Sequence, residues 1–81
     1  MSKSEVNFPI YKKRFDSKSF YKIISKQEFE EIQLIGKKAV FYFHEVKIYP
    51  DQLLMNDMLE KEELYLDIEE DEYLEQKKGT H

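Results

Sequence analysis

The chain has 81 residues, a net charge of −4 and no cysteine, which excludes a disulfide framework and a cysteine-ligated metal site. Its hydrophobic content of 41% is too high for a disordered chain, although 37% of its residues are charged. We therefore expect a single domain over residues 1–81, stabilised by apolar packing or by a partner chain, with disordered termini at residues 1–7 and 79–81.

The first part of the chain is typical of a β-hairpin. Residues 8–15 and 19–24 are rich in aromatic and β-branched side chains, which favour strands. The Asp-Ser-Lys-Ser sequence at residues 16–19 is typical of a turn, because Asp and Ser side chains bond to their own backbone. We expect the two strands to pair across this turn.

A helix is predicted for residues 26–35. Ser25 and Glu28 match an S-x-x-E capping box, in which each side chain bonds to the backbone N–H of the other residue. Gly36 suits the left-handed position that ends many helices. Apolar side chains three residues apart would form the buried stripe of this helix: Phe29, Ile32 and Ile35.

Residues 39–49, AVFYFHEVKIY, carry the strongest strand pattern in the chain. The first half of this segment is apolar on both alternating faces, which is typical of a central strand covered on two sides. One layer of short helices covers only one face of a small sheet, so we expect the C-terminal segment or a second copy of the chain to cover the other. The candidate surface of such a homodimer consists of Phe41, Phe43 and Tyr49.

The last part of the chain predicts two helices on either side of a short strand. Pro50 ends the long strand, and a helix over residues 51–60 follows. Residues 64–68 alternate as a strand, and residues 69–77 form a last helix. The predicted fold class is therefore α+β, with three helices and a small, single-layer, mostly antiparallel sheet of three or four strands.

Two stretches of the chain are similar to each other: YKIISKQEFEE begins at Tyr21, and YLDIEEDEYLE begins at Tyr65. Both are predicted to run from a strand into the acidic first turn of a helix. The first stretch contains ISKQEFEE, which resembles the I-S-x-x-E-[FY]-E-E junction of small uncharacterised bacterial α+β proteins. This resemblance covers residues 8–60, and it implies a strand-to-helix arrangement but no activity.

The charges are distributed unevenly along the chain. Residues 1–49 carry ten Lys and Arg against six acids, and residues 50–81 carry three Lys against eleven acids. We expect the two halves to complement each other in the fold or to solvate opposite faces. Acids in the first turn of the last helix would also complement the positive end of its dipole.

The acidic segment, residues 60–75, is the first candidate partner-binding surface. It contains nine acids: Glu60, Glu62, Glu63, Asp67, Glu69, Glu70, Asp71, Glu72 and Glu75. Acids repeated along a helix approximate the phosphates of a nucleic acid, so this surface could occupy the basic groove of a nucleic-acid-binding protein. The basic first half of the chain argues against such mimicry, because it would repel the same partner.

Catalysis and metal binding find little support in the sequence. His44 and Glu45 are adjacent on a strand and point to opposite faces, so they cannot act together, and His44 is expected to pack at the edge of the core. No serine lies in a glycine-bounded elbow, and the two glycines cannot form a phosphate-binding loop. We therefore predict no catalytic residue, cofactor, metal or small-molecule substrate.

Direct nucleic-acid binding is the third hypothesis, and it would use basic residues from two segments: Lys12, Lys13, Arg14, Lys37 and Lys38. The acidic pI near 5.2 argues against it.

The sequence thus favours a small, cytoplasmic, non-catalytic protein–protein interaction module. We expect no membrane segment, because no apolar run reaches the roughly 20 residues that cross a bilayer. The alternative is an acidic mimic that inhibits or regulates a nucleic-acid-binding protein, as phage or plasmid inhibitors do.

Overall fold

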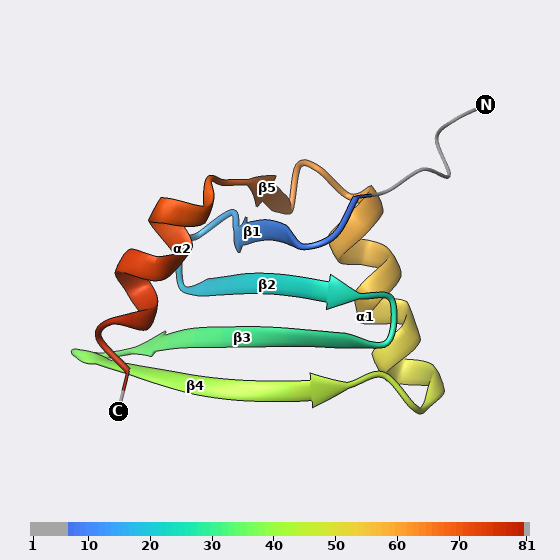
Figure 1. The fold of residues 1–81 in the computed structure, drawn as a ribbon, viewed down its shortest axis with the longest axis horizontal. Coiled ribbons are helices and arrows are strands. Elements are labelled where there is room, and N and C mark those ends of the chain that lie inside the picture. Colours follow the sequence, from blue (N-terminus) through green and yellow to red (C-terminus); the bar gives the residue numbers. More distant parts are fainter. Residues whose placement is uncertain (1–6, 81) are drawn as a thin grey trace.

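A computed structural model of the protein describes residues 7–80. These residues form one antiparallel five-stranded sheet and two helices, in the spatial strand order β4-β3-β2-β1-β5 (Figure 1). The elements in chain order are β1 (Ile10–Arg14), β2 (Ser19–Ser25), β3 (Glu28–Ile35), β4 (Lys38–Glu45), α1 (Tyr49–Glu60), β5 (Tyr65–Asp67) and α2 (Glu70–Lys77). The predicted α+β fold is confirmed, and its sheet has five strands where three or four were expected.

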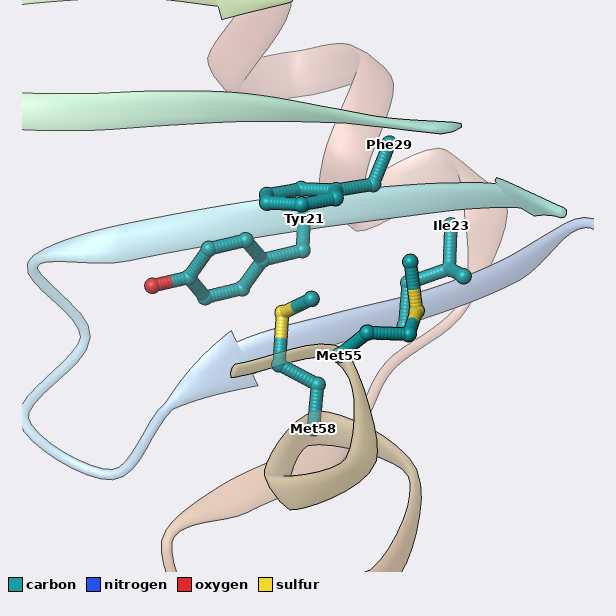
Figure 2. Close-up of a cluster of buried hydrophobic side chains, with 5 residues drawn as sticks. All are labelled: Tyr21, Ile23, Phe29, Met55 and Met58. Atoms are coloured by element: carbon teal, nitrogen blue, oxygen red, sulfur yellow. The ribbon is translucent and has the colours of Figure 1, made fainter. Parts of the chain in front are cut away.

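The two helices cover opposite faces of the sheet and cross it at opposite ends (Figure 1). On the face that we call the α1 face, three side chains from β2 and β3 project towards Met55 and Met58 of α1 (Figure 2). These three side chains are Tyr21, Ile23 and Phe29. On the opposite α2 face, Phe20 and Ile32 pack against Tyr73 of α2. The core therefore consists of two clusters, one under each helix.

The prediction of a helix over residues 26–35 is wrong, because these residues include strand β3. Phe29 and Ile32 are both buried, as the helical stripe required, but they lie on opposite faces of the sheet. A spacing of three residues places side chains on one face of a helix and on opposite faces of a strand. Because each face of this sheet has its own helix, a strand can bury both side chains.

Ser25 and Gly36, which the helix prediction placed at the two ends of a helix, therefore lie at the hairpin turns on either side of β3. The hydroxyl of Ser25 accepts the backbone N–H of Gln27 at 3.1 Å, within the turn between β2 and β3. Gly36 is left-handed, with a φ of 62°, but it stands in the turn between β3 and β4. A glycine with positive φ at the first central position is typical of a type II′ hairpin turn.

The similar stretches that begin at Tyr21 and Tyr65 do not have the same structure. The first runs from β2 into β3, and the second runs from β5 into α2. The two tyrosines nevertheless meet on the α1 face, where their ring centroids are 5.8 Å apart in an edge-on arrangement.

The prediction that residues 39–49 form a central strand is also wrong, because β4 is the outermost strand of the sheet. The central strand is β2, which buries Phe20 on the α2 face and Tyr21 on the α1 face. Tyr42 and Phe43 of β4 are 38% and 50% exposed. The aromatic side chains on both faces of β4 thus lie at an edge of the sheet.

The two later helices and the β5 strand form as predicted. Met55 and Met58 of α1 are fully buried, and the C-terminal helix α2 covers the second face of the sheet, one of the two coverings that the sequence allowed. The predicted disorder of residues 1–7 and 79–81 falls largely on residues 1–6 and 81, which lie outside the described residues. Thr80 forms a parallel β-bridge with Ala39. No helix within residues 7–80 is both long and apolar enough to cross a membrane.

Candidate protein-binding surfaces

The two outer strands of the sheet differ in length and in surroundings. β5 has three residues, whereas β4 has eight. Short strands and flanking charges protect a sheet edge from pairing with other chains. β5 is short and acids precede and follow it, whereas β4 is long, contains neither proline nor a bulge in its pairing with β3, and has charged residues only at its two ends, Lys38 and Glu45. The edge of β4 is therefore the more open of the two.

The backbone of β4 alternates between bonding to β3 and pointing away from it. The N–H of Val46 donates to the carbonyl of Gln27 at 2.7 Å. The backbone N–H and C=O groups of the even-numbered residues of β4 therefore point towards β3. In an antiparallel ladder the intervening residues then direct both N–H and C=O outwards. Ala39 is one of these outward residues, and it is bridged to Thr80.

Three outward positions remain along β4: Phe41, Phe43 and Glu45. No strand within residues 7–80 pairs with β4 on this side. An unpaired edge of this length is a template for the addition of a further strand.

Two aromatic side chains accompany this open backbone, one on each face. Tyr42 points to the α1 face, and Phe43 to the α2 face. Phe41 is partly buried against the α2 cluster, and the Nζ of Lys77 lies 5.2 Å from the centre of its ring. A strand added at this edge would therefore meet apolar surface on both faces and a positive charge on one.

A groove of about 400 Å³ borders the beginning of β4. Its lining consists of Lys37, Lys38, Ala39, Val40 and Gly79. The groove extends the open edge towards the C-terminal residues and adds two lysines to its surroundings.

The predicted homodimer surface combined Phe41, Phe43 and Tyr49. Phe41 and Phe43 share the α2 face of β4, as the strand alternation requires. Tyr49 belongs to the first turn of α1 and is 68% exposed. It is therefore not part of the β4 face, because the strand ends at Glu45 before the chain reaches it.

The acidic segment lies around β5 and α2. Four of its nine acids contact basic or hydroxyl groups: Asp67 with Lys12 at 2.8 Å, Glu70 with Tyr11 at 3.3 Å, Glu72 with Lys13 at 3.2 Å and Glu75 with Lys78 at 3.9 Å. The other five are exposed: Glu60, Glu62, Glu63, Glu69 and Asp71. The basic first half and the acidic second half therefore complement each other within the fold, between β1 and the C-terminal elements.

The last helix has the charge order that its dipole favours. Glu70, Asp71 and Glu72 occupy its first turn, and Lys77 lies in its last turn. Anions near the N-terminus and cations near the C-terminus each contribute about 0.3–1 kcal/mol at exposed positions. This local role accounts for the first-turn acids without a ligand.

The buried carboxylate of Glu31 in the sheet was not predicted from the sequence. Glu31 is 8% exposed, and it accepts hydrogen bonds from Gln33 at 2.9 Å and pairs with the Nε2 of His44 at 2.9 Å. The His44 ring stacks on Phe29 at 4.7 Å, so His44 packs at the edge of the core as predicted. The cross-strand register of β3 and β4 creates this pair, which residue spacing along the chain could not reveal.

In this arrangement Glu31 and His44 contribute to the packing of β3 against β4. Within residues 7–80, no buried side-chain nitrogen or oxygen lacks a hydrogen-bond partner, and no group of three or more potential ligands could hold a metal ion. The carboxylate is thus already satisfied by the sheet.

Burial also changes the ionisation of three tyrosines. Burial, together with the nearby Glu31 carboxylate, raises the pKa of Tyr21 to about 12. Burial and the hydrogen bond to Glu30 raise the pKa of Tyr73 as well. Burial and the adjacent Glu70 raise the pKa of Tyr11. All three hydroxyls therefore remain protonated at neutral pH, and those of Tyr73 and Tyr11 donate hydrogen bonds to Glu30 and Glu70.

The basic residues of the nucleic-acid hypothesis lie on different strands. Lys12, Lys13 and Arg14 belong to β1, where each pairs with an acid. Lys37 and Lys38 lie at the turn between β3 and β4. Two strands separate β1 from β4, so these five residues do not form one basic patch.

Comparison of the chain with protein-family models, with curated proteins and with solved structures found no match.

Proposed function

We propose that the protein is a non-catalytic protein-binding module that accepts an extended segment of its partner as an additional strand along β4. The observation that carries this proposal is the open edge of β4, where Phe41, Phe43 and Glu45 direct unpaired backbone groups outwards. In this mode of recognition the backbone supplies affinity and alternate side chains supply specificity.

The side chains around the open edge of β4 also support the addition of a partner strand. Phe43 and Tyr42 offer apolar contacts on opposite faces of an added strand. The groove beside Ala39 and Val40 offers room for a side chain of the partner near two lysines. We therefore expect a partner segment that alternates apolar side chains and carries an acid near the Lys37–Lys38 end.

A proline at position 43 tests this proposal. The N–H of Phe43 points away from β3, so Phe43→Pro removes a donor of the open edge and leaves the pairing with β3 in place. Phe43→Ala is the matched control, because it removes the same ring and keeps the donor. Amide hydrogen exchange of the remaining β-sheet checks that both variants fold.

The probe is a displayed library of random peptides as long as β4. We expect peptides selected on the native chain to slow amide exchange at Phe41 and Glu45, to bind the alanine variant more weakly and to be lost from the proline variant. Peptides that bind the proline variant as well as the alanine variant, or that leave the exchange of Phe41 and Glu45 unchanged, would overturn the proposal.

An acidic mimic of nucleic acid is the second candidate. Its support is the group of five exposed acids at the β5 side of the molecule, the opposite side from β4. It is the weaker candidate, because four of the nine acids are engaged within the fold and because Lys12 and Lys13 lie on the neighbouring strand. Binding to a basic partner that is lost at moderate salt, and that persists in Phe43→Pro, would favour it.

A further inference from the structure

We propose that the partner strand is β4 of a second copy of this chain, paired antiparallel about a two-fold axis at Phe43. This inference rests on the proposed function, since it uses the same edge, and it names the occupant. The sheets of two copies would join into one continuous sheet of ten strands, twice the five of one chain.

The open edge is symmetric about Phe43. Thr80 bridges Ala39 at one end, and β4 stops at Glu45 at the other. The outward positions between these limits are Phe41, Phe43 and Glu45, with Phe43 in the middle. Opposing residues of an antiparallel pair share a face, and the pairs whose backbone groups point towards each other exchange hydrogen bonds. Two copies can therefore use all three outward positions only when Phe43 lies opposite Phe43 of the second copy.

This register brings opposite charges together. It places Glu45 of the second copy opposite Phe41, and both side chains point to the α2 face. The Nζ of Lys77 lies over the Phe41 ring at 5.2 Å and is 40% exposed, so it is available to a carboxylate at that position. Lys77 already contacts Glu30 at 3.3 Å, which holds its ammonium near the edge. The two-fold axis creates this ion pair twice.

The same register matches the aromatic side chains. Phe43 would meet Phe43 of the second copy on the α2 face, and Tyr42 would meet His44 of the second copy on the α1 face. Aromatic pairs directly opposite each other are among the favourable cross-strand contacts. His44 is held by Phe29 and Glu31, so little of its freedom remains to be lost on association.

The helices leave room for this arrangement along the sheet. α1 and α2 cross opposite faces at opposite ends (Figure 1). A two-fold axis perpendicular to the sheet keeps each face on its own side and exchanges the two ends. The α2 helices of two copies would therefore lie on the same face of the joined sheet but at its two opposite ends.

Single cysteines test both the partner and the register, because the chain has no cysteine of its own. With Phe43 opposite itself, the two Cα atoms would be about 5.5 Å apart, within the range that a disulfide bridges. Glu45 would be four residues out of register with its own copy, about 14 Å away and beyond reach. Phe43→Cys and Glu45→Cys therefore form a matched pair of variants on the same edge.

We expect Phe43→Cys to become a covalent dimer in a glutathione redox buffer and Glu45→Cys to remain a monomer under the same conditions. Sedimentation of the native chain over a dilution series should show a monomer–dimer equilibrium that is weakened on the order of tenfold or more in Phe43→Pro. Equal cross-linking of the two cysteine variants, or a native chain that stays monomeric throughout, would overturn the proposal.

These outcomes separate this proposal from the proposed function. A native chain that stays monomeric and still binds peptides along β4 keeps the open edge as a binding site and removes the second copy as its occupant. A chain that dimerises equally well as Phe43→Pro contradicts the second copy as the occupant, and the peptide experiment then decides the proposed function independently.

Discussion

The hydroxyl of Tyr73 donates a 2.8 Å hydrogen bond to Oε1 of Glu30 and thereby ties α2 to β3 on the α2 face of the sheet. The Tyr73 side chain is fully buried, and Lys77 contacts the same oxygen at 3.3 Å. Both donors come from α2, so a single carboxylate on β3 holds two side chains of the helix.

Tyr73→Phe should measure the strength of this tie. The ring stays in place while a hydrogen bond to a charged acceptor is lost, so we expect the free energy of unfolding to fall by about 1–3 kcal/mol. Urea denaturation measures the change. Tyr42→Phe removes an exposed hydroxyl from β4 and should change the free energy by less than about 0.5 kcal/mol. Equal losses in the two variants would contradict this role of Tyr73.

Stability should fall in alkaline solution because of the buried tyrosines. The pKa of Tyr21 is raised to about 12 in the folded chain, above the value of about 10 for an unfolded tyrosine. The fold thus favours the protonated form, and its contribution to stability is complete below pH 10 and is lost as the pH rises from about 10 to about 12.

Tyr21→Phe isolates this contribution. The informative quantity is the difference between the native chain and the variant in urea denaturation at several pH values, because groups shared by both cancel in it. We expect the alkaline loss of stability to be smaller in Tyr21→Phe than in the native chain. Tyr49→Phe, at an exposed position, should lose stability as the native chain does; a Tyr21→Phe curve parallel to both would count against the buried tyrosine.

Met58 anchors α1 to the sheet beside Tyr21 (Figure 2). It is fully buried, so Met58→Ala leaves a cavity, and we expect it to cost about 2–5 kcal/mol of unfolding free energy. Leu53 lies on the same helix with 47% of its surface exposed, and Leu53→Ala should cost much less. Thermal or urea denaturation compares the two. A similar cost at both positions would mean that α1 does not pack through Met58.

The local signals in the sequence determined where elements begin and end more reliably than which element forms. Ser25 and Gly36 were identified as boundary residues, and both stand at turns. The segment between them was misassigned because Phe29 and Ile32 fit a helical stripe equally well. Only the presence of a helix on each face of the sheet decides between the two interpretations, and that is a property of the whole fold.

The same non-local property explains the misplacement of β4. A strand that is apolar on both faces was predicted to be central, but the central position belongs to β2. The apolar side chains of β4 are only partly buried within the chain, as the exposure of Phe43 shows. The buried Glu31–His44 pair depends on strand register, which the sequence pattern does not contain.

The ion pair between Lys13 and Glu72 joins the basic and acidic halves of the chain at 3.2 Å. Glu72→Lys replaces attraction by repulsion at a half-exposed site, so we expect a loss of about 0.5–1 kcal/mol, smaller at high salt. Glu62→Lys makes the same charge change at an exposed position before β5 and serves as the control. Equal effects of the two substitutions in urea denaturation, or an effect of Glu72→Lys that does not weaken with salt, would contradict a contribution from this ion pair.

Gly36 and Gly79 are the only glycines of the chain, and of the two only Gly36 has a left-handed backbone. Gly36 has a φ of +62° and nothing within 4 Å of an added Cβ, so the cost of Gly36→Ala is the left-handed backbone alone, about 1–2 kcal/mol. At Gly79 an added Cβ would meet the Gln76 carbonyl oxygen at 3.5 Å, an ordinary contact, so Gly79→Ala should be nearly neutral. Urea denaturation of both variants measures the difference. The reverse order of costs would mean that the turn between β3 and β4 does not need its left-handed residue, and the register that sets the open edge of β4 would then be in doubt.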